Sequence, residues 1–75
     1  MDDTKRLVTM ANQIADFFRP YPEDEAVKNT YEHLIQFWEP RMRVKMIAHV
    51  AAGGAGLNAI ALAACKQLKK PASVA

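Results

Sequence analysis

Apolar residues recur at helical spacing in four stretches of this chain, and prolines or glycines separate the stretches. The first stretch covers residues 4–18, and its apolar positions occupy about half of the helical circumference. The main line of this stretch is Leu7, Ala11, Ile14 and Phe18. Pro20 and Pro22 then end the pattern, because proline lacks the amide hydrogen that a helix interior requires.

The second stretch begins at Pro22 or Glu23, where three acidic residues favour the positive end of a helix dipole. Its main stripe is Val27, Tyr31, Leu34 and Trp38. The apolar arc again spans about half of the circumference, which exceeds the roughly 100° that a surface helix needs. Two faces of this width are more than a helical cluster of this length can cover. The pattern therefore predicts apolar surface that is left for a partner.

Two more helices complete the predicted chain. Pro40 suits the first position of a third helix, and the glycines at 53–54 end it because glycine adopts the left-handed conformation easily. Residues 57–68 then form an alanine-rich fourth helix with a thin packing face. The sequence thus predicts an all-α fold, a small bundle of three to four short helices. We expect one domain over residues 1–68 and a flexible tail at 69–75.

Composition narrows the class of protein. The chain has 75 residues, of which 51% are hydrophobic, and it carries a net charge of +2. A folded domain of this size removes about 60% of the unfolded surface from water, so it can hardly enclose a substrate pocket as well. One cysteine excludes an internal disulfide, and with two histidines it is too few for a zinc site. We therefore predict no catalytic residues and no metal site, and the acidic N-terminus is unlike a secretory signal.

Several local features suggest chemistry but have simpler explanations. The glycines at 53–56 precede a helix, yet a phosphate loop needs a preceding strand and a Lys-Ser or Lys-Thr pair. A helix-to-helix turn is the better interpretation. His33 and His49 have no evident acid–base partner, and we expect His33 to be a core or interface residue. Cys65 is expected to be a small packing residue because no second cysteine accompanies it.

Residues 46–65 carry no formal charge and are long enough to span a bilayer. Three glycines, His49 and Asn58 lie within this stretch, and Lys45 and Lys66 flank both of its ends. This symmetrical arrangement lacks the charge asymmetry of a membrane span. Two amphipathic helices joined by the glycine turn fit the pattern better, and no membrane partner is expected.

An aromatic and arginine cluster follows the second helix. Phe37, Trp38, Arg41 and Arg43 have the composition that is enriched at interface hot spots. Guanidinium groups suit bidentate contacts with carboxylates or phosphates. Either arginine taken alone is best interpreted as a solvated side chain. The prediction of a docking surface therefore depends on the aromatic and arginine residues occurring together.

These segments resemble the small delta subunit of soluble, NAD-dependent formate dehydrogenases. One matching segment is Met-Ala-Asn-Gln-Ile-Ala at 10–15, followed by Phe17 and Phe18. The other begins with Glu-Ala-Val at 25–27 and ends with Phe-Trp-Glu-Pro-Arg-Met-Arg at 37–43. The similarity covers residues 7–57, and the run at 37–43 is its most specific part.

The resemblance implies a non-catalytic accessory subunit of a cytoplasmic, bacterial formate dehydrogenase complex. Such a subunit supports assembly, quaternary structure or cofactor insertion by docking on the catalytic alpha subunit. It implies no cofactor in this chain. The complex as a whole is expected to carry a bis-molybdopterin guanine dinucleotide with molybdenum or tungsten, iron–sulfur clusters, FMN and NAD.

We predict a set of partner-binding residues from the cluster and the resemblance together. They are Asn12, Gln13, Phe37, Trp38, Arg41, Met42 and Arg43, with Arg41 and Arg43 as contacts to an anion. Two alternatives stay open. The apolar faces would also be covered in a free-standing homo-oligomer. A helix-turn-helix nucleic-acid module would use Arg41, Arg43 and Lys45, but the small net charge argues against nucleic acid as a partner.

Overall fold

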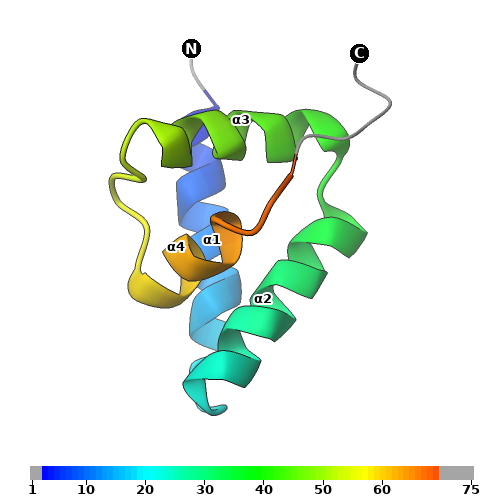
Figure 1. Ribbon diagram of the computed structural model, residues 1–75, viewed down its shortest axis with the longest axis vertical. Coiled ribbons are helices and arrows are strands. Elements are labelled where there is room, and N and C mark those ends of the chain that lie inside the picture. The colour runs from blue at the N-terminus through cyan, green and yellow to red at the C-terminus, as the bar shows by residue number, and fades with distance from the viewer. Residues whose placement is uncertain (1–2, 70–75) are drawn as a thin grey trace.

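The computed structural model describes residues 3–69 and contains four α-helices in this range (Figure 1). The helices are α1 (Thr4–Phe18), α2 (Glu23–Phe37), α3 (Pro40–Ala51) and α4 (Ala59–Cys65). The all-α prediction is confirmed, and the bounds of the first three helices agree with the sequence pattern. The predicted tail lies outside the described residues except for Lys69.

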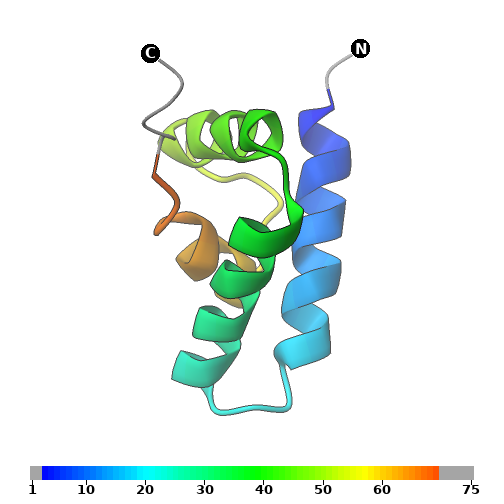
Figure 2. The same ribbon diagram turned by 90° about the vertical axis from the view of Figure 1, so that its right-hand side faces the viewer.

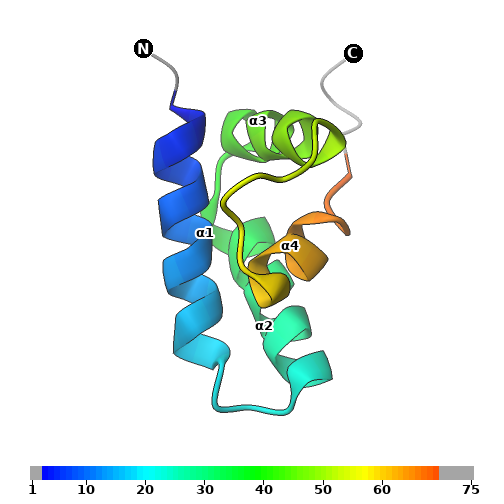
Figure 3. The same ribbon diagram turned by 90° about the vertical axis from the view of Figure 1, so that its left-hand side faces the viewer.

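The two longest helices, α1 and α2, form an antiparallel pair that is joined by a short turn at residues 19–22 (Figure 2). Helix α3 crosses the end of the pair where α1 begins and α2 ends. Helix α4 contacts α1, α2 and α3, and it lies in front of α2 in the view of Figure 3. The view from the opposite side shows α1 and α2 without α4 in front of them (Figure 2).

The hydrophobic core lies where the four helices meet. Its members are Leu7, Ala11, Ala15, Leu34, Trp38, Met46, Ala61, Cys65 and Leu68. Leu7 and Ala11 follow the predicted line of α1, whereas Ile14 and Phe18 are only partly buried. Small residues on α1 and α4 fill much of this core, which allows the helix backbones to approach closely.

The buried face of α2 differs from the predicted stripe. Ala26, Thr30 and Leu34 are fully buried, whereas Val27 and Tyr31 are half-buried. A buried hydroxyl needs a hydrogen-bond partner, and Thr30 Oγ1 donates to the carbonyl oxygen of Ala26 at 2.7 Å. This hydrogen bond satisfies the hydroxyl and allows Thr30 to be buried. Helix α2 can therefore direct Ala26 and Thr30 toward the neighbouring helices.

Helix α4 is shorter than the predicted range of residues 57–68. Asn58 is its N-cap, with an extended backbone and a side-chain oxygen that accepts a hydrogen bond from the Ala61 amide at 2.8 Å. Asparagine in this position ends the preceding loop and starts the helix, which leaves Leu57 outside it. Leu68 lies beyond the helix but is still buried, so the predicted apolar face is partly formed by turn residues.

The connection between α3 and α4 is the predicted helix-to-helix turn. All three of its glycines have positive φ, and a Cβ on Gly54 would lie 2.6 Å from Leu62 Cδ1. The positive φ therefore favours glycine there, and a Cβ would also require the end of the Leu62 side chain to shift. This turn divides the uncharged stretch at residues 46–65 between two helices. Within residues 3–69, no helix combines the length and hydrophobicity that a membrane span requires.

Candidate docking surface

An open groove of about 520 Å³ runs along the α1–α2 pair and reaches the first turn of α3. The residues that line it are Met10, Gln13, Ile14, Phe17, Phe18, His33, Phe37, Trp38 and Met42. Apart from Gln13 and His33, all of these side chains are apolar or aromatic. A surface of this composition on a small chain is typical of a protein–protein contact.

Two phenylalanines make this groove unusually exposed. Phe17 on α1 is 73% exposed and Phe37 on α2 is 67% exposed. The imidazole of His33 packs against the Phe37 ring, with a centroid distance of 4.6 Å, and Phe18 packs edge-on against Phe17 at 5.0 Å. His33 is thus part of an aromatic surface, which agrees with the expected interface position. The expected surplus of apolar surface is confirmed for these side chains.

A second hollow, of about 420 Å³, adjoins the groove. Met10 and Met42 line both hollows, so the two form one continuous surface. The charged residues of the second hollow are Asp3, Arg6, Glu39, Arg41 and Lys45. Lys45 Nζ lies 3.4 Å from Asp3 Oδ2, and Arg41 Nη2 lies 3.8 Å from Glu39 Oε1. We call the continuous surface the docking groove and the second hollow its charged end.

Five of the predicted partner-binding residues line this surface. Gln13, Phe37 and Met42 line the groove, and Arg41 lies at the charged end with its side chain 89% exposed. Trp38 also borders the groove but is only 4% exposed. The extended backbone after α2 turns its indole into the core, so Trp38 belongs to the core rather than to the exposed contact surface.

Arg43 and Asn12 have partners within the chain. The Arg43 guanidinium donates hydrogen bonds to the carbonyl oxygens of Trp38 and, at 3.4 Å, Ile35. These carbonyls lie at the end of α2, where helix carbonyls lack helical partners and favour positive charge. Arg43 therefore links α2 to α3 through Nη1, and the anion contact expected of this residue stays a prediction.

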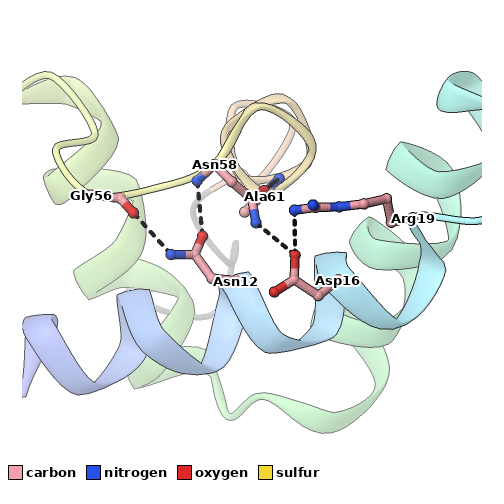
Figure 4. Close-up of polar contacts among 6 residues, drawn as sticks. All are labelled: Asn12, Asp16, Arg19, Gly56, Asn58 and Ala61. Carbon is pink, nitrogen blue, oxygen red and sulfur yellow. Dashed lines mark hydrogen bonds and ion pairs between the residues drawn. The ribbon is translucent and has the colours of Figure 1, made fainter.

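Asn12 joins α1 to the loop that precedes α4 (Figure 4). Its Nδ2 donates to the carbonyl oxygen of Gly56 at 2.8 Å, and its Oδ1 accepts from the Asn58 amide at 2.9 Å. Asp16, one turn further along α1, accepts a hydrogen bond from Asn58 Nδ2 at 3.4 Å. Both ends of the Asn12 amide are thus occupied, which makes this residue a structural link within the chain. Its contact with a partner stays a prediction.

Replacing this link should destabilise the fold. We expect Asn12→Ala to lower the free energy of unfolding by about 1–3 kcal/mol, because two backbone groups lose their hydrogen-bond partner. Urea denaturation followed by Trp38 fluorescence measures the change. Gln13→Ala, at the exposed neighbouring position, is the matched control and should change stability by less than about 0.5 kcal/mol. Equal stability of the two variants would contradict the structural role.

Cys65 and His49 lie outside the apolar groove and have structural surroundings. Burial raises the pKa of the Cys65 thiol to about 12, so it stays protonated at neutral pH and fits the expected packing role. His49 Nε2 lies 2.7 Å from the carbonyl oxygen of Ala55 and donates to it, which holds the glycine turn against α3. Among residues 3–69, no group of three or more His, Cys, Asp and Glu side chains is arranged to hold a metal ion.

The sequence was compared with protein families, curated proteins and solved structures. The family model for the NADH-dependent formate dehydrogenase delta subunit, FdsD, matches residues 6–65. The chain belongs to the formate dehydrogenase delta-subunit family. The comparisons with curated proteins and with solved structures gave no match.

The region matched by the delta-subunit family contains the whole apolar groove and all seven predicted partner-binding residues. Sequence reasoning missed several members of the groove. They are Arg6, Met10, Ile14, Phe17 and Phe18. A usable signal was the adjacent pair Phe17–Phe18, because neighbouring residues of a helix lie about 100° apart and cannot both point to the centre of a core.

Proposed function

We propose that this delta subunit is a non-catalytic accessory subunit that docks on the catalytic alpha subunit of its formate dehydrogenase. Family membership makes the chain a subunit of such a complex. The observation that carries the proposal is the docking groove, which exposes Phe17 and Phe37 on a chain of only 75 residues. Full burial of such a side chain contributes about 1.5–3 kcal/mol.

The chemistry of the complex is assigned to its larger subunits in this proposal. They would carry the bis-molybdopterin guanine dinucleotide with molybdenum or tungsten, the iron–sulfur clusters, FMN and NAD. The delta subunit would support assembly, quaternary structure or cofactor insertion in a bacterial cytoplasm. Its own described residues supply an apolar contact surface, and the proposal uses them for binding.

Co-expression of the tagged chain with the alpha subunit of the same formate dehydrogenase tests this function. We expect the alpha subunit to co-purify, and we expect formate-dependent NAD reduction by the complex to fall when the delta subunit is omitted. Sedimentation of the isolated chain provides a second measurement. A stable homo-oligomer that does not bind the alpha subunit would overturn the proposal and favour self-association through the same groove.

Phe37→Ser tests whether the groove makes the contact. Because Phe37 is largely exposed, we expect an unchanged melting temperature but a dissociation constant for the alpha subunit that rises about thirtyfold, as for a hot-spot residue. Titration by biolayer interferometry measures this constant. Ile35→Ser is the control, since Ile35 is 42% exposed on the same helix but does not line the groove. Equal losses in both variants would place the contact elsewhere.

A further inference from the structure

The docking groove has an apolar centre and one charged end, and this asymmetry indicates what occupies it. Its centre is apolar, between Phe17 on α1 and Phe37 on α2. Its charged end is lined by Arg6 and Arg41, which come from two different helices. A partner that fits must therefore be apolar along its length and charged at one end.

The basic groups at the charged end are not matched by acidic ones within the described chain. Of the two acidic residues there, Asp3 pairs with Lys45, and Glu39 makes a long, exposed contact with Arg41. Arg6 has no acidic partner among residues 3–69. Arg6 and Arg41 thus carry two positive charges, and only Glu39 is left to balance them. Such a site favours an added carboxylate, which a guanidinium binds in bidentate geometry.

The fold also indicates the shape of the occupant. Helix α4 already lies against the α1–α2 pair on one side (Figure 3), whereas the docking groove, lined by residues of α1, α2 and α3 together with Trp38, is open. A groove between two antiparallel helices suits the apolar face of a third helix. No strand is present among residues 3–69 to offer an edge for an added strand.

We propose that the docking groove binds an amphipathic helix of the alpha subunit that carries a carboxylate at the end facing Arg6 and Arg41. This inference rests on the proposed function and specifies its contact. The apolar residues of the partner helix pack between Phe17 and Phe37. The carboxylate fixes the direction of the helix, because only one orientation brings it to the charged end.

The first arm of the test identifies the occupant by photo-crosslinking. Phe17→p-benzoylphenylalanine keeps an aromatic ring in the groove, and irradiation of the co-expressed complex followed by mass spectrometry locates its neighbour. We expect crosslinks to one amphipathic helix of the alpha subunit with an Asp or Glu within two turns. Crosslinks to a second copy of this chain, or to a loop or strand, would overturn the inference.

The second arm tests the charged end by charge reversal. We expect Arg6→Glu combined with Arg41→Glu to raise the dissociation constant for the alpha subunit at least tenfold at low salt. Raising the salt concentration should weaken wild-type binding and narrow this difference, since exposed charges are screened. Lys28→Glu combined with Lys66→Glu makes the same charge change on exposed residues outside the groove and should have less than a threefold effect.

The outcomes separate this inference from the proposed function. If both double variants bind as the wild type does, the complex exists but the arginines do not direct it, and the inference fails alone. If the wild-type chain does not bind the alpha subunit, the proposed function fails. Replacement of the partner carboxylate identified by crosslinking with Lys should restore binding to the Arg6→Glu, Arg41→Glu variant, and the absence of rescue would also contradict the inference.

Discussion

Trp38→Ala is expected to unfold much of the protein before any effect on partner binding can be observed. Trp38 is buried in the core, and truncation of such a residue to alanine lowers the free energy of unfolding by about 3–5 kcal/mol. A domain of 75 residues has a total stability of about 4–11 kcal/mol. Far-ultraviolet circular dichroism during urea and thermal denaturation measures the loss, because it does not depend on the tryptophan.

A conservative variant separates the packing role from a contact role. Trp38→Phe retains an aromatic ring and should lose less stability than Trp38→Ala, with a folded spectrum at 25 °C. If Trp38→Ala kept the wild-type melting temperature and yet lost binding to the alpha subunit, the indole would be a surface contact. That result would favour the role predicted from the sequence over the position found in the structure.

Met46→Ala is expected to have the second largest effect. Met46 lies on α3 and is fully buried in the core. Truncation of a buried methionine to alanine lowers the free energy of unfolding by about 2–5 kcal/mol. Urea denaturation followed by Trp38 fluorescence measures the shift of the midpoint. The slope of the transition should stay near the wild-type value, since the surface exposed on unfolding changes little.

Met42→Ala is the matched control, because it makes the same chemical change one turn earlier on α3. Met42 is half-buried and lines the docking groove, so its truncation should cost less stability than that of Met46 and should weaken binding to the alpha subunit. The two methionines therefore separate folding from docking on one helix. A larger stability loss for Met42→Ala than for Met46→Ala would contradict this assignment.

The sequence predicted helix ends well where local chemistry sets them. Pro20 and Pro22 bound the turn after α1, and Pro40 begins α3, because proline acts on the backbone at its own position. Helix α4 was predicted to be too long, because the helical spacing of apolar residues already begins at Leu57, before the helix starts. The start at Ala59 depends on the Asn58 cap, which competes with the helical pattern.

The candidate site was predicted only in part, because it depends on how the helices are rotated about their axes. Phe37 and Met42 reach the groove as expected, and the family resemblance predicted the subunit that the comparison found. Asn12 and Arg43 were predicted only as partner contacts, and the sequence did not reveal that they bind backbone groups of the chain. Those partners lie up to 46 residues away and become visible only when the chain is folded.

The same separation between Asn12 and Asn58 has a consequence for the order in which the chain folds. The contacts between α1 and α2 join neighbouring segments, so this helical hairpin can form early and rapidly. The Asn12 link closes only after Gly56 and Asn58 have been synthesised. Until then the hairpin exposes apolar surface on two sides, and α4 covers one of them. The side of the hairpin that α4 later occupies therefore stays exposed until α4 has been synthesised.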